Sequence, residues 1–207
     1  MLALTLARKG CKVGLFDLDF TSPSTHVILG VENVHPKEKN GIIPPCVHGL
    51  NYMSIIYYSG EYASPLRGAD VSNVLIELLA ITRWNTLDFL IIDMPPGIGD
   101  ATLDVIRLVE RIRFLIVTTS SQLTFETVGK LMNLLSELKI PVIGVIENMK
   151  MRESHFIQQR VEREGVTFWG DTPFDSKLEE AIGNADNLLK TEFGKKLGRV
   201  IAEKLKL

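Results

Sequence analysis

The sequence Phe-Leu-Ile-Ile-Asp-Met-Pro-Pro-Gly-Ile-Gly-Asp occupies residues 89–100 and carries the strongest signal for the fold. Its apolar run, 89–92, is too short for an independent helix and shows no polar alternation, which is typical of a strand buried on both faces of a parallel sheet. The run ends in Asp93, and the prolines and glycines that follow predict a loop. Open α/β sheets bind ligands at the carboxyl ends of their strands, so Asp93 is expected beside a ligand. The alternative is an ordinary strand-to-helix turn in which Asp93 only caps the next element.

Strands and helices are predicted to alternate on both sides of this segment. Apolar runs rich in β-branched and aromatic residues predict strands at 12–17, 50–58, 114–118, 142–146 and 166–169. Helical spacing predicts helices at 1–9, 21–30, 69–81, 103–109, 123–138, 153–164, 176–182 and 192–205. Residues 31–49, with several prolines and charges, predict an irregular surface segment. The order favours the α/β class: a doubly wound, mostly parallel sheet with helices on both faces.

Length and composition narrow the function classes. A chain of 207 residues predicts one domain spanning 1–207. A net charge of -2 with dispersed basic residues gives no electrostatic footprint for nucleic acid, so no nucleic-acid partner is expected. No apolar run approaches the roughly 18 residues of a membrane span, and Arg8 and Lys9 follow the apolar opening, unlike the order in a signal peptide. A cytoplasmic location is therefore expected.

Two further segments, one before and one after residues 93–100, also carry recognisable motifs. Residues 12–24 read Lys-Val-Gly-Leu-Phe-Asp-Leu-Asp-Phe-Thr-Ser-Pro-Ser, and residues 142–149 read Val-Ile-Gly-Val-Ile-Glu-Asn-Met. Together the three resemble switch I, Walker B with switch II, and the Glu-Asn-Met strand of the Mrp-type ATP-binding proteins. These proteins are a branch of the ParA/MinD group of P-loop NTPases with a role in iron–sulfur cluster assembly. Ser22 stands where that family usually has glycine.

The resemblance implies a site for ATP and Mg²⁺ at the ends of the first two of these strands. Asp93, helped by Asp17, would hold Mg²⁺ through water, and Asp19 would orient the attacking water. Gly97 would offer its backbone N–H to the γ-phosphate end of the nucleotide. The alternative for Asp17 and Asp19 is that both are solvated caps at a strand end.

The nucleobase would meet a different part of the chain. The resemblance implies that Asn148 reads the adenine edge and that the loop 172–175, with Pro173 in it, covers the base. The alternative is that this loop is only a turn.

The phosphate cradle of the family, G-K-G-G-x-G-K-[ST], occurs nowhere in the 207 residues. Such a loop works through successive backbone N–H groups at a helix N-terminus and a lysine charge. Measured back from Asp17, it should end roughly five residues before Met1, with its strand earlier still and next to the Asp93 strand in the sheet. We therefore expect Met1 to be an internal methionine. Without the cradle, the 207-residue chain is expected to be inactive as an ATPase.

The cysteine content bears on iron–sulfur chemistry. Mrp-type proteins commonly carry C-x-x-C after Glu-Asn-Met, where a dimer can share a cluster. Residues 150–156 contain no cysteine, and Cys11 and Cys46 form neither a C-x-x-C pair nor a disulfide framework. Cluster binding by this chain is therefore unsupported.

Three functions remain open at this point. The first is an Mrp-like ATPase that forms a homodimer and serves iron–sulfur client or assembly proteins. The second is a nucleotide-free scaffold or regulatory partner with the same fold. The third, a MinD-like spatial regulator, would use the basic tail 193–207 as a membrane-binding amphipathic helix.

Overall fold

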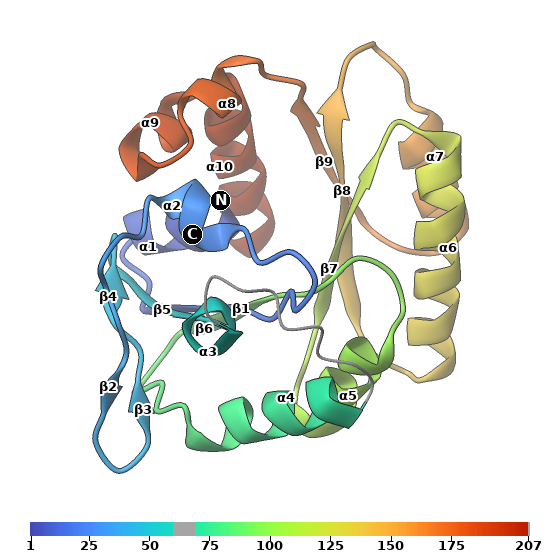
Figure 1. The fold of residues 1–207 in the computed structure, drawn as a ribbon. Helices are drawn as coiled ribbons and strands as arrows, with labels where there is room; N and C mark the ends of the chain where they lie inside the picture. Colours follow the sequence, from blue (N-terminus) through green and yellow to red (C-terminus); the bar gives the residue numbers. More distant parts are fainter. Residues whose placement is uncertain (60–68, 207) are drawn as a thin grey trace. The chain divides into compact units, whose positions relative to one another are not determined.

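The computed structural model describes residues 1–59 and 69–206 (Figure 1). The contacts divide the chain into two compact units. Unit 1 comprises residues 1–108 and 181–189, and unit 2 comprises residues 109–180 and 190–207. The expectation of one domain over residues 1–207 stays a prediction.

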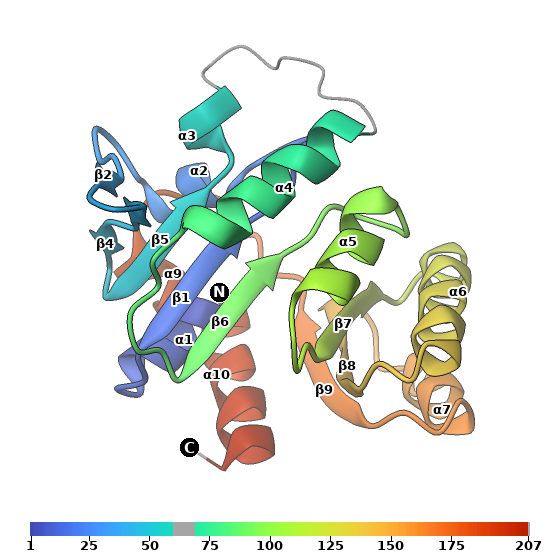
Figure 2. The same ribbon diagram turned by 90° about the horizontal axis from the view of Figure 1, so that it is seen from below.

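Unit 1 is built on a four-stranded sheet in the order β4-β5-β1-β6. Its strands are β1 (Val13–Asp17), β4 (Cys46–Val47), β5 (Leu50–Ser54) and β6 (Phe89–Asp93). Both β5 and β6 run parallel to β1, and the register aligns Asp17 with Ser54 on one side and with Asp93 on the other (Figure 2). The carboxyl ends of all three strands therefore meet at one edge of the sheet.

Helices cover both faces of this sheet. They are α1 (Leu2–Arg8), α2 (Thr25–Leu29), α3 (Ile56–Ser59), α4 (Ala69–Ile81), α5 (Asp100–Leu108) and α9 (Ala185–Lys190). The helices α1 and α4 lie on opposite faces (Figure 1). Leu4, Leu6, Phe16 and Leu75 are fully buried between these layers and form the core of unit 1.

Residues 181–189 return to unit 1 from far along the sequence and pack on α2. The Gly183 N–H donates to the Ile28 carbonyl at 3.0 Å. A Cβ on Gly30 would lie only 2.2 Å from the Gly183 oxygen, and Gly30 has a φ of +62°, so this close approach needs glycine. An ion pair between Arg8 and Asp186 adds a second attachment.

Unit 2 is a three-stranded parallel sheet in the order β7-β8-β9. Its elements are β7 (Phe114–Thr119), α6 (Gln122–Glu137), β8 (Val142–Lys150), α7 (Phe156–Arg163), β9 (Phe168–Pro173), α8 (Lys177–Glu180) and α10 (Glu192–Leu205). The helices α6 and α7 cover one face and α10 covers the other (Figure 1). Within the described ranges, no helix is long and apolar enough to cross a membrane.

The predicted elements are largely confirmed, with corrections at their ends. The segment 31–49 contains the two-residue strands β2 (Lys37–Glu38), β3 (Ile42–Ile43) and β4, so it is less irregular than expected. The strand predicted at 50–58 ends at Ser54, where the chain turns into α3. The strand predicted at 142–146 continues to Lys150, because Lys150 still pairs with Pro173.

Two apolar strands have an open edge. Among the described residues, β6 pairs only with β1 and β7 pairs only with β8. The four apolar side chains of β6 are half-buried rather than fully buried, which corrects the expectation of a strand covered on both faces.

The packing of Gly144 in β8 yields a stability prediction. A Cβ at this position would lie 1.9 Å from Cδ1 of Trp169, whose indole N–H donates to the Ile143 carbonyl at 2.6 Å. Gly144→Ala should therefore lower the free energy of unfolding by about 1–3 kcal/mol, because either the indole or the strand must move. Urea denaturation measures the change.

Gly129→Ala is the matched control for this substitution. A Cβ on Gly129, inside α6, meets nothing within 4 Å, so alanine should stabilise the helix by about 0.5–1 kcal/mol. A Gly144→Ala protein as stable as the parent would show that Trp169 does not fill this space.

Candidate functional site

Asp17 ends β1 and is fully buried, with 0% of its surface exposed. Its Oδ2 accepts hydrogen bonds from the Thr25 N–H at 3.3 Å, from the Thr25 hydroxyl, and from the Ser54 hydroxyl at 3.4 Å. Its Oδ1 accepts from the Asp19 N–H at 3.1 Å. The carboxylate therefore joins the end of β5, the start of α2 and the loop after β1.

Asp19 shapes the loop that leads from β1 to α2. Its Oδ1 accepts from the Thr21 N–H at 3.0 Å, from the Thr21 hydroxyl at 2.5 Å and from the Ser22 N–H at 3.0 Å. Asp19 therefore caps this loop, and its role towards a ligand stays a prediction. The loop and its carboxylate are held at the same strand ends as Asp17.

Asp93 ends β6 directly beside Asp17 in the sheet register. Asp93 is exposed at the end of β6, yet partial desolvation at the sheet edge raises the pKa of its carboxyl above the ordinary value. The negative charges of Asp17 and then Asp19 raise the pKa further, while the Met1 amino group acts in the opposite direction. Three carboxylates thus share one edge of the sheet, and their mutual repulsion disfavours ionisation of Asp93.

The loop after β6 contains Gly97 in a left-handed conformation, with a φ of +86°. A Cβ there would meet nothing within 4 Å, so the demand for glycine comes from the backbone angle and not from crowding. Two residues later the Gly99 carbonyl accepts from the Thr102 N–H at 3.0 Å as α5 begins. Because glycine has no side chain, nothing on Gly97 itself covers its backbone N–H in this turn.

Asn148 lies near the end of β8 in unit 2. Its Oδ1 accepts from the Met149 N–H at 2.8 Å and from the hydroxyl of Thr172, in β9, at 2.9 Å. Met149 has a φ of +55°, a conformation that non-glycine residues seldom adopt. Thr172 is 1% exposed, so the hydroxyl that meets Asn148 comes from the core of the unit.

Pro173 is the last residue of β9 and pairs with Lys150 in the sheet. The loop predicted at 172–175 therefore begins inside a strand, and only Phe174 and Asp175 lie beyond it. The Phe174 N–H donates to the Lys150 carbonyl at 3.1 Å, and the Phe174 ring is 58% exposed. The exposed aromatic ring, rather than the proline, is the feature that sequence reasoning missed in this loop.

Glu147 is a second residue that sequence reasoning missed. Its side chain is 1% exposed, and its Oε1 accepts from the Ser120 hydroxyl at 2.7 Å. Lys150 Nζ lies 4.0 Å from Glu147 Oε2 and 3.5 Å from Asp171 Oδ2, and Lys196 reaches Asp171 at 3.6 Å. The signal was a charged residue directly after an apolar strand, one position before Asn148.

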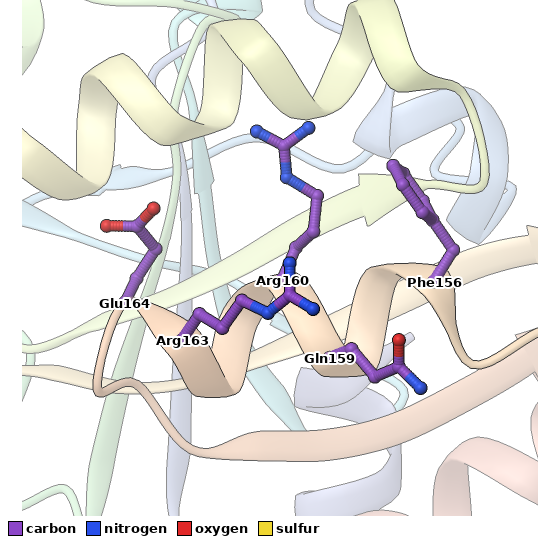
Figure 3. Close-up of a pocket in the computed structure, with 5 residues that line it drawn as sticks. All are labelled: Phe156, Gln159, Arg160, Arg163 and Glu164. Carbon is purple, nitrogen blue, oxygen red and sulfur yellow. The ribbon is translucent and has the colours of Figure 1, made fainter.

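One hollow in unit 2 is lined by none of these residues (Figure 3). It measures about 430 Å³ and is lined by Phe156, Gln159, Arg160, Arg163 and Glu164, all from α7 or the residue that follows it. The Arg160 guanidinium lies over the rings of Phe125 and Phe156 and pairs with Glu126 at 3.1 Å. Its charge is already used within the unit, so this hollow is a surface depression and not the candidate site.

The predicted residues therefore fall into two groups. Asp17, Asp19, Asp93 and Gly97 gather at the strand ends of unit 1, whereas Asn148 and Pro173 lie on neighbouring strands of unit 2. Within the described part of the chain, no cluster of three or more His, Cys, Asp or Glu side chains is arranged to hold a metal ion directly. Both free cysteines, Cys11 and Cys46, lie in unit 1.

The parallel strands, the helices on both faces and the acidic strand ends define an α/β protein of the P-loop NTPase class. Over residues 1–205 the chain matches the model of the ParA family described as "NUBPL iron-transfer P-loop NTPase", and it belongs to that family. The resemblance noted from the three motifs is thereby confirmed.

Named relatives share part of the chain. An iron–sulfur cluster carrier protein of Pseudomonas fragi is 39% identical over 152 residues, which is 72% of this chain and 53% of the relative. The chloroplastic Fe–S cluster assembly factor HCF101 of Arabidopsis thaliana is 40% identical over 152 residues, which is 72% of this chain and 28% of that protein. The aligned residues thus span about half or less of these relatives.

Solved structures confirm the fold. A nucleotide-binding protein of Archaeoglobus fulgidus in complex with ADP has a TM-score of 0.73 and 27% identity, covering 90% of this chain and 79% of that one. The septum site-determining protein MinD of Pyrococcus horikoshii, with Mg-ADP, has a TM-score of 0.69 and 18% identity, covering 98% and 86%. At that identity the second likeness concerns the fold alone.

The raised pKa of Asp93 predicts a pH-dependent stability. Because the folded protein disfavours the ionised carboxylate, stability should fall as pH rises from below the ordinary pKa of 3.8 through the raised value. Asp93→Asn removes this cost, so at neutral pH the variant should have a higher Tm than the parent. Thermal unfolding at pH values from acidic to neutral measures the effect.

Glu77→Gln, at an exposed position of α4, is the control for the loss of one negative charge. It should leave the pH profile of the parent unchanged. An Asp93→Asn protein with the parent's profile would mean that Asp93 carries no electrostatic strain.

Proposed function

We propose that this chain forms the nucleotide-hydrolysing part of an iron–sulfur cluster assembly or transfer protein. The observation that carries the proposal is the cluster of Asp17, Asp19 and Asp93 at adjacent strand ends, in a chain of the NUBPL-type family. The relatives named as cluster carriers and assembly factors supply the biological role. ATP is the nucleotide, and the protein acts as a homodimer on client or assembly proteins in the cytoplasm.

Mg²⁺ fits the acidic edge of unit 1. The donors are hard carboxylate oxygens, and the raised pKa of Asp93 marks negative charge that a cation would compensate. Mg²⁺ usually keeps several waters, which suits a site without three direct side-chain ligands. Bound there, the ion would neutralise charge on the β- and γ-phosphates. Asp93 would hold its water shell, and Asp17, whose oxygens are already bonded, would help indirectly by fixing the strand ends.

Asp19 and Gly97 complete the proposed hydrolytic arrangement. Asp19 caps the loop that ends at α2, and from this fixed place at the strand ends its carboxylate would orient the attacking water. The backbone N–H of Gly97 would donate to the γ-phosphate, since no side chain of its own shields it. In unit 2, Asn148 would contact the base, and the exposed ring of Phe174 beside Pro173 would cover it.

A nucleotide-free scaffold is the second candidate, and one observation favours it. The 207 residues contain no glycine-rich cradle, and each charge-assisted phosphate bond that such a loop makes is worth roughly 1.5–3 kcal/mol. The membrane-regulator alternative is disfavoured by α10, because its apolar residues Leu197, Val200 and Ile201 are buried. The predicted membrane-binding tail ends at Leu207, which lies outside the described residues.

The hydrolysis proposal is tested by supplying the cradle. We define the cradle-bearing protein as this chain preceded by a strand and a G-K-G-G-x-G-K-[ST] loop. It should hydrolyse Mg-ATP, whereas the 207-residue polypeptide should not. In the cradle-bearing protein, Asp19→Ala should lower turnover at least about 100-fold and keep ATP affinity within about twofold, because water orientation acts in the transition state.

The same cradle with its lysine changed to alanine is the control, and phosphate release and calorimetric titration are the measurements. Asp19→Ala with the parent's turnover would reduce Asp19 to a loop cap. An inactive cradle-bearing protein that binds no ATP would favour the scaffold.

The iron–sulfur cluster would be cargo that partner proteins hold. Because C-x-x-C is absent after Met149, anaerobic reconstitution with iron and sulfide should leave the 207-residue polypeptide without a stable visible absorption band. A stoichiometric band would contradict this expectation. Its loss in Cys46→Ser but not in Cys11→Ser would then identify the exposed Cys46 as a ligand.

A further inference from the structure

The orientation of the Asn148 amide is fixed by its neighbours. The Met149 N–H lies 2.8 Å from one terminal atom of this side chain, and a backbone N–H can only donate. The atom beside it must therefore be the oxygen. The Thr172 hydroxyl donates to the same atom from 2.9 Å, so both lone pairs of Oδ1 are used inside unit 2.

This arrangement leaves the Asn148 NH₂ group as the part of the amide available to a ligand. A bidentate contact with adenine needs the amide oxygen for the N6 amino group and the amide nitrogen for N7. With both oxygen lone pairs occupied, the donor half remains, and its natural partner is the N7 acceptor that adenine and guanine share. Pyrimidines lack this atom.

Thr172 is well placed to maintain the orientation. It is 1% exposed and lies in β9, the strand that neighbours β8 (Figure 1). A buried hydroxyl on a sheet strand has little freedom to turn away, and loss of its bond would leave a polar group unsatisfied. The Met149 N–H, which donates to the same oxygen, supplies the second restraint.

We propose that Thr172 is a positioning residue that locks the Asn148 amide with its NH₂ group turned outward to donate to N7 of a purine nucleotide. The inference rests on the proposed function. It makes Asn148 a reader of purines in general, and the distinction between adenine and guanine falls to other groups.

The test compares ATP with 7-deaza-ATP, which lacks the N7 acceptor, by calorimetric titration of the cradle-bearing protein. The parent should bind ATP about two- to tenfold more tightly, the worth of one hydrogen bond. Thr172→Val, which keeps the shape and loses the hydroxyl, should lower this ratio, because only the Met149 N–H then holds the amide oxygen. Thr172→Ser, which restores the hydroxyl, should bring the preference back.

Thr118→Val is the control, since Thr118 is another buried hydroxyl of unit 2, bonded to the Thr119 carbonyl. Thr118→Val should leave the ratio of ATP to 7-deaza-ATP affinity unchanged. It therefore separates a general destabilisation of unit 2 from loss of the Thr172–Asn148 hydrogen bond. This inference alone is overturned if the parent protein binds ATP and 7-deaza-ATP equally, or if the Thr172→Val variant keeps the full preference for ATP. Absence of any purine nucleotide binding overturns the proposed function and this inference with it.

Discussion

The buried carboxylate of Asp17 is the constraint on which unit 1 depends. A charged group with no exposed surface is costly unless donors surround it, and here Thr25, Ser54 and the backbone of Asp19 supply those donors. Each donor belongs to a different segment, so satisfying one charge fixes where β5 ends, where α2 starts and how the intervening loop leaves β1. The acidic edge is therefore assembled by the fold and does not wait for a ligand to order it.

Much of unit 1 was predictable because its signals are local. The run before Asp93 and the alternation of strands and helices gave the α/β class and the sheet edge where the three acidic residues meet. The roles of their oxygens were not predictable, because Thr25 and Ser54 are ordinary residues in sequence and become partners of Asp17 only through strand register. Likewise, the half-buried state of β6 depends on which strands flank it, and an apolar run in the sequence does not predict its neighbours in the sheet.

Unit 2 shows the same division between local and long-range information. Asn148 was identified by the resemblance of its Glu-Asn-Met strand to a family motif. Its partner Thr172 lies on a separate strand, and the register between β8 and β9 is irregular there. Lys150 prolongs β8 beyond its apolar core because it pairs with Pro173 and meets buried Glu147 and Asp171. Such a polar strand end has no hydrophobic period to reveal it. Position in the sheet, and not residue type, decides what these side chains do.

The return of residues 181–189 to unit 1 has a consequence for synthesis on the ribosome. Gly183 closes against Gly30, so the first unit lacks one of its packing surfaces until more than 150 later residues have been made. Unit 2 is likewise interrupted, because α10 is translated only after that return. Neither unit can finish folding while the other is still to come, and contacts of such long sequence separation slow folding. Until those segments are made, the surfaces that residues 181–189 and α10 cover stay open on the nascent chain, and such transiently exposed apolar surface favours aggregation.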